Sequence, residues 1–73
     1  MQITYDPDRD ILQIAFNQRD VDETARVSPN LILDYDEDGL IVGLELRHAS
    51  KRVDNPMSFT FTVGDADVEK PQP

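Results

Sequence analysis

Residues 34–45, DYDEDGLIVGLE, hold the side chains of this chain that are best suited to chemistry. The stretch fits the EF-hand calcium-loop pattern D-x-[DN]-x-[DN]-G-x5-E at every required position. Oxygen ligands at this spacing surround Ca²⁺ when the loop wraps around the ion. One interpretation is therefore a metal site made by Asp34, Asp36, Asp38 and Glu45.

The same residues also predict a β-hairpin, and their flanks favour that interpretation. A calcium loop of this kind needs a helix on each side, but Pro29 precedes it closely and Gly43 lies where the second helix would begin. An Asp-Gly pair such as Asp38–Gly39 is typical of a two-residue hairpin turn. That turn predicts three apolar pairs on one face, namely Leu31 with Leu46, Leu33 with Leu44, and Tyr35 with Val42.

A second candidate site is the basic stretch RHASKR, in an otherwise acidic chain. Its candidate binding residues are Arg47, His48, Ser50, Lys51 and Arg52. With Ser50 as a helix cap, a short turn there could present N–H groups and cations to an anion. The alternative is that these cations pair with nearby acids such as Glu45 and Asp54. We favour the alternative, because exposed charge runs are usually solvated.

Catalytic chemistry has little support in the composition. The chain has no cysteine and a single histidine, so it offers no set of nucleophile, base and orienting residue. Pairs of carboxylates act as acid and base only where a desolvated cleft separates their pKa values, and a chain of this size has little room for one. We expect no catalytic residues, no cofactor and no enzymatic activity.

Length and charge restrict the choice of partners. A chain of 73 residues forms one small domain whose core is marginal, which favours self-association, as in a homodimer. The net charge of −8 argues against nucleic acid and suits a basic protein partner. No apolar run is long enough to span a membrane, and the first residues lack the features of a signal peptide, so we expect a cytoplasmic protein.

Alternating apolar and polar residues predict a mainly β (or small α+β) fold. We expect an antiparallel sheet of about five to six short strands built from hairpins, with at most one short helical turn near residues 49–53. Besides the hairpin over 31–47, the alternating runs lie at residues 2–5, 11–16, 21–27 and 57–63. A single domain over residues 1–63 is expected, followed by a flexible tail over residues 64–73.

Three blocks of sequence, taken in order, resemble the DUF2283 family of small bacterial proteins of unknown function. The blocks are ITYDPDRDILQIAF, LILDYDEDGLIVGLEL and ASKR, and the likeness spans residues 2 to about 54. The resemblance implies no established activity and no catalytic residues. Genes of this family often lie beside genes for small toxin-like proteins, so the resemblance implies an antitoxin-like, partner-binding role.

Together these observations predict a small non-catalytic protein that acts by binding another protein. The expected partner is a small basic protein, a second copy of the chain, or both. The alternative is a metal- or anion-binding module that uses the acidic hairpin tip (34–45) or the basic turn (47–52).

Overall fold

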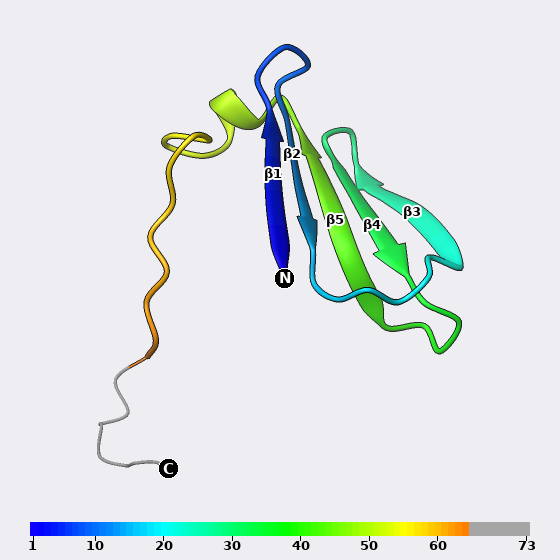
Figure 1. Ribbon diagram of the computed structural model, residues 1–73. Coiled ribbons are helices and arrows are strands. Elements are labelled where there is room, and N and C mark those ends of the chain that lie inside the picture. The colour runs from blue at the N-terminus through cyan, green and yellow to red at the C-terminus, as the bar shows by residue number, and fades with distance from the viewer. Residues whose placement is uncertain (65–73) are drawn as a thin grey trace.

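The computed structural model describes residues 1–64, which form one open antiparallel sheet (Figure 1). The five strands are β1 (Gln2–Asp6), β2 (Ile11–Ala15), β3 (Glu23–Ser28), β4 (Leu31–Tyr35) and β5 (Ile41–Arg47), in the order β1-β2-β5-β4-β3. A single 3₁₀ turn, η1 (Ala49–Lys51), follows β5. The predicted mainly β, antiparallel fold is confirmed. The expected tail lies, from residue 65 onward, outside the described residues.

The β1–β2 hairpin closes through a turn at residues 7–10. One oxygen of the Asp6 carboxylate accepts hydrogen bonds from the backbone N–H groups of Asp8, at 3.0 Å, and Arg9, at 3.2 Å. Aspartate side chains commonly organise turns in this way. The turn ends at Asp10, which has a left-handed backbone (φ 56°). The turn therefore fixes the place of Asp10 at this end of the sheet.

The β4–β5 hairpin has the predicted register over most of its length but a different tip. Leu31 pairs with Leu46 and Leu33 with Leu44, as predicted. The predicted two-residue turn at Asp38–Gly39 is wrong. The hairpin closes instead through a three-residue loop that ends at Gly39, whose φ is +79°. The Asp36 N–H closes this loop by donating to the Leu40 carbonyl at 2.9 Å. A bulge then restores the register, so Tyr35 pairs with Ile41 and not with Val42.

Cross-strand pairing separates the sheet into an apolar and a polar face. Residues directly opposite each other point to the same side of a sheet, so the registers define rows across it. The apolar face carries two rows, Ile3–Ile14–Leu44–Leu33–Ala25 and Tyr5–Leu12–Leu46–Leu31–Ser28. The polar face carries the rows Thr4–Gln13–Glu45–Ile32–Arg26 and Gln2–Ala15–Gly43–Asp34–Thr24. The two faces are therefore chemically distinct.

The alternating residues 57–63 do not form the strand that the sequence predicts. They run as an extended segment away from the β1 edge and pair with no strand of the sheet (Figure 1). We call residues 57–63 the arm. Its large apolar side chains are largely exposed, from 67% for Phe59 to 76% for Met57. The alternation is real, but among residues 1–64 the arm has no strand partner.

Very little of the described chain is fully buried. The buried apolar side chains are Val42 and Ala49, and among residues 1–64 no large side chain is fully enclosed. Even the centre of the apolar face, at Leu44 and Ile14, is only half-buried. No helix within these residues is long and apolar enough to cross a membrane. The described structure is thus a single layer with neither face covered.

Candidate functional site

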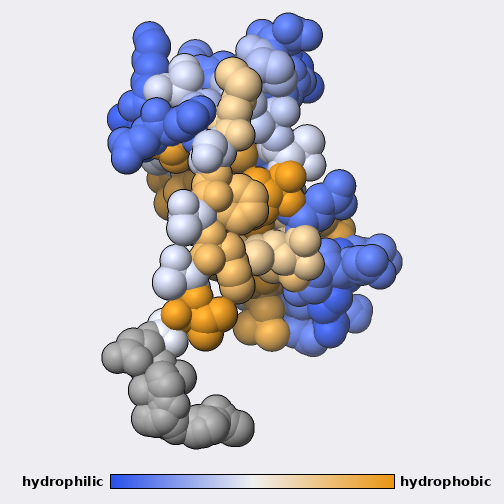
Figure 2. Space-filling view, turned by 60° about the vertical axis from the view of Figure 1, so that its left-hand side comes forward, coloured by the Kyte–Doolittle hydropathy of each residue, from blue (hydrophilic) through white to orange (hydrophobic). Residues whose placement is uncertain are grey.

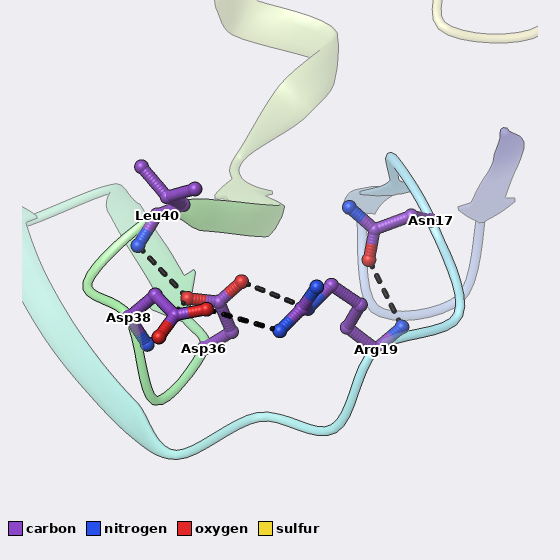
Figure 3. A network of polar contacts seen from close by, with 5 residues as sticks. All are labelled: Asn17, Arg19, Asp36, Asp38 and Leu40. Carbon is purple, nitrogen blue, oxygen red and sulfur yellow. Dashed lines mark hydrogen bonds and ion pairs between the residues drawn. The ribbon is translucent and has the colours of Figure 1, made fainter.

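An ion-pair network joins two loops at one end of the sheet, which we call the acidic end (residues 17–22 and 36–39). The Arg19 guanidinium lies 3.0 Å from the Asp36 carboxylate and 3.2 Å from that of Asp38 (Figure 3). Asn17 supports the loop, since its side-chain oxygen accepts the backbone N–H of Arg19 at 2.9 Å. The β2–β3 connection is thereby tied to the tip of the β4–β5 hairpin.

Asp36 is the buried member of this network, with a residue exposure of 4%. Its Oδ1 accepts the backbone N–H groups of Asp38, at 2.9 Å, and Leu40, at 3.0 Å. Its other oxygen faces Arg19. Because buried carboxylates need such partners, Asp36 acts first as the organiser of the hairpin tip.

A shallow groove of about 480 Å³ lies between the two loops of the acidic end. Its acidic lining residues are Asp20, Asp22, Asp36 and Glu37. Arg19 is the only basic residue in the lining, and it is already paired with two carboxylates. The groove therefore offers a negative surface to an incoming group.

The four carboxylates of the calcium-loop interpretation are spread over the hairpin. Asp34 lies on the polar face and accepts the Thr24 hydroxyl at 2.9 Å. Glu45 accepts Arg47 at 2.8 Å and Gln13 at 3.2 Å, and the hydrogen bond from Arg47 holds its pKa below the ordinary value. The flanking segments are strands β4 and β5, so the helices of a calcium loop are not formed. Among residues 1–64, no three His, Cys, Asp or Glu side chains are grouped to hold a metal ion.

The basic stretch is divided between the strand and the turn. Arg47 lies on the polar face and pairs with Glu45, as the ion-pair interpretation expects. His48 occupies the position before η1 with a left-handed backbone (φ 54°), and no side chain caps the turn, so the predicted Ser50 cap is wrong. Lys51 and Arg52 are exposed and form no ion pair within the described part of the chain. The five candidates therefore do not converge on one point.

Ser50 instead belongs to a hydrogen-bonded cluster around Asp10, which we call the Asp10 cluster. The Asp10 carboxylate accepts the Ser50 hydroxyl at 2.7 Å, the Ser50 N–H at 2.9 Å and the Tyr5 hydroxyl at 2.7 Å. The Ala49 N–H donates to the Asp10 carbonyl at 3.0 Å, and Ala49 itself is completely buried. The cluster fastens η1 to the β1–β2 turn. Sequence reasoning missed it because 40 residues separate Asp10 from Ser50.

The Asp10 cluster shifts two titrations in opposite directions. Hydrogen bonds from Ser50 and Tyr5 lower the pKa of Asp10, because they stabilise its charged form. The hydrogen bond to Asp10 raises the pKa of Tyr5, because it stabilises the neutral hydroxyl. The cluster is thus strongest where Asp10 is charged and Tyr5 is neutral.

This arrangement predicts that acid unfolding depends on Asp10. The pKa of Asp10 is lower in the folded state than in the unfolded state. Its contribution to folding stability is therefore complete above the unfolded-state pKa of about 3.9 and is lost as the pH falls through the folded-state pKa. Asp10→Asn should therefore lower the melting temperature at pH 7 and flatten its decline between pH 5 and 2. Thermal unfolding followed by circular dichroism measures both effects. Asp8→Asn, in the same turn, is the control and should match the parent; equal curves for all three proteins would contradict the role of Asp10.

Fold and contacts define a small antiparallel β protein with an acidic end, an end closed by the Asp10 cluster, and an open apolar face. The chain belongs to the family described as protein of unknown function (DUF2283), which matches residues 2–50. This confirms the resemblance seen in the sequence. No curated protein and no solved structure matches the chain. The match covers all five strands and ends within η1, so the arm lies beyond it.

Proposed function

We propose that this chain is a non-catalytic protein-binding protein whose acidic end receives a small basic protein. The observation that supports the proposal is the groove between residues 17–22 and 36–39, whose acidic residues outnumber its single, already paired arginine. An acidic surface of this kind attracts and orients a basic partner. The antitoxin-like role implied by the family resemblance is one form of this function.

Three exposed carboxylates of the groove are free to meet such a partner. Asp20, Asp22 and Glu37 are exposed and make no side-chain hydrogen bond or ion pair among residues 1–64. Asp36, by contrast, is occupied by Arg19 and by two backbone N–H groups. A cationic side chain could therefore pair with Asp20 or Glu37 without breaking the network that shapes the groove.

Charge reversal at the groove tests the proposal directly. The double variant Asp20→Lys/Glu37→Lys should weaken binding of a small basic protein by about 100-fold, because it replaces two attractive contacts by repulsive ones. The matched control, Asp8→Lys/Asp54→Lys, makes the same change in net charge at the other end of the sheet, and its effect should stay within about fivefold.

The ligands for this measurement are the products of the two flanking genes, titrated calorimetrically against the full chain. We expect one of them to bind, with an affinity that falls by about tenfold or more between 50 and 300 mM salt, because screening weakens charge contacts. The proposal is overturned if neither product binds, if salt leaves the affinity unchanged, or if both double variants lose the same affinity.

A further inference from the structure

The apolar face of the sheet has no covering layer in the part of the chain that the structure describes. No helix or strand lies over either face of the sheet among residues 1–64 (Figure 1). The large side chains at the centre of the apolar face, such as Leu12, Ile14, Leu33 and Leu44, remain half-buried. Stable domains bury the apolar side of a sheet against a second layer. A face of this size left in water therefore calls for a partner surface.

The composition of the face selects the kind of partner. Its two central rows run across all five strands and hold no charged residue. Most acidic groups of the described residues lie on the polar face and in the end loops, and Glu23, opposite Tyr35 on the edge strand β3, lies on the apolar side but outside the two central rows. A basic partner would find no counter-charge in these two rows. A second uncharged apolar sheet surface would fit them.

We infer that a second copy of this chain covers the apolar face, so that two sheets pack face to face as a two-layer dimer. The same patch then serves both subunits, as in two-fold symmetric dimers. The arrangement keeps both polar faces and both acidic ends in water. It also supplies the second layer that residues 1–64 do not form. This inference is independent of the proposed basic partner, which binds elsewhere.

The arm extends the apolar face beyond the β1 edge. An apolar groove of about 380 Å³ lies between β1 and the start of the arm, lined by Ile3 and Tyr5 on one side and by Met57 and Phe59 on the other. Figure 2 shows apolar side chains gathered in one continuous band along this edge of the molecule. In the dimer, the arm of each chain lies against the apolar surface of its partner.

The chain's own arm cannot replace the second copy. Its large apolar residues are Met57, Phe59, Phe61 and Val63, all highly exposed, whereas the two rows of the face span five strands. Seven residues in extended form can shield about the width of one strand, since neighbouring strands lie about 4.8 Å apart. Most of the face would stay open even if the arm folded back. The arm therefore completes an interface that a second sheet provides.

Sedimentation equilibrium of the full chain tests the dimer. At 100 µM protein we expect twice the chain mass of 8.3 kDa. Association should strengthen as salt rises from 50 to 500 mM, because salt screens the repulsion between two chains of net charge −8 and leaves apolar contacts in place. A folded monomer at 100 µM throughout this salt range overturns the inference.

Variants of the arm test its place in the interface without altering the sheet. Phe59→Asp/Phe61→Asp should raise the dimer dissociation constant by about 100-fold or more, because aromatic anchors dominate such interfaces. Thr60→Asp/Thr62→Asp adds the same charge to the other side of the same segment and should change the dimer dissociation constant by less than about fivefold. Equal effects of the two double variants overturn the role of the arm. Since neither pair lies at the acidic end, both should bind the flanking-gene product like the parent, so a failed dimer and a failed basic partner are separate results.

Discussion

Gly43→Ala is expected to lower the free energy of unfolding by about 2 kcal/mol, the middle of the range for overpacking in a tightly packed site. Gly43 lies in the central strand β5, where a Cβ atom would come within 2.9 Å of the Ile14 carbonyl oxygen. That oxygen belongs to the backbone of β2, which pairs with β5 on this side. The clash can be relieved only if the two strands shift apart, so the pairing at the middle of the sheet is weakened.

The matched control is Gly64→Ala. A Cβ atom at Gly64 meets nothing within 4 Å, so this substitution should leave stability unchanged within about 0.5 kcal/mol. Urea unfolding of both variants and the parent, at one fixed protein concentration, gives the comparison, because dimerisation makes apparent stability depend on concentration. Equal midpoints for the three proteins would contradict the close approach of β2 and β5.

Asp36→Ala is the second substitution with a large expected effect, again a loss of about 2 kcal/mol. It removes the acceptor of the Asp38 and Leu40 N–H groups and the partner of Arg19. A donor left without a partner in a partly buried site costs about 1–3 kcal/mol. The hairpin tip should therefore loosen, and the 17–22 loop should lose its attachment. Urea unfolding measures the stability, and amide exchange at Leu40 measures the tip.

Two further variants separate the hydrogen bonds of Asp36 from its charge. Asp36→Asn keeps a side-chain oxygen for the two N–H groups and loses the charge that faces Arg19, so its cost should be smaller than that of Asp36→Ala. Glu37→Ala, next in the chain and exposed, is the control and should be neutral. If Asp36→Ala were no worse than Glu37→Ala, the buried carboxylate would not be organising the tip.

The hairpin shows both the reach and the limit of sequence reasoning. Apolar alternation predicted that Leu31 faces Leu46 and Leu33 faces Leu44, because any odd shift would invert every side chain. It could not predict the tip, where a three-residue loop and a bulge shift the register in opposite directions. The Asp36 carboxylate stabilises this loop form by accepting hydrogen bonds from backbone N–H groups. Hydrophobic periodicity carries no information about such bonds.

The arm shows a different limit. Alternation at residues 57–63 predicts which side chains share a side of an extended segment. The choice of arm variants depends on this part of the prediction. Whether the segment becomes a strand depends on an available sheet edge, which the alternation does not describe. The arm leaves the β1 edge after η1 and the Pro56 region, and it finds no pairing among residues 1–64.

Candidate sites were the hardest part to predict. Two local sequence patterns suggested sites, namely the calcium-loop pattern of 34–45 and the basic cluster of 47–52. The fold distributes their side chains among different contacts. The Asp10 cluster joins residues far apart in the chain, so it could be recognised only once the β1–β2 turn and η1 were placed side by side. Asp10 of the first sequence block and Ser50 of the ASKR block thus belong to one hydrogen-bonded cluster.

The two proposed associations use different surfaces. We propose that the acidic end, where Asp20 and Glu37 are free, receives a basic protein through charge. We infer that the apolar face and the arm receive a second copy of the chain through burial of apolar area. Salt should therefore act on the two associations in opposite directions, weakening the first and strengthening the second.

The most direct test of the open apolar face is an isotope-filtered nuclear Overhauser experiment on a mixture of labelled and unlabelled full-length chains. The two-layer dimer predicts contacts between chains that connect methyl groups of Leu33 and Leu44 with the apolar face of the partner, and contacts from the Phe59 ring to the same surface. A folded protein that shows no such contacts at 500 µM and 500 mM salt would contradict it.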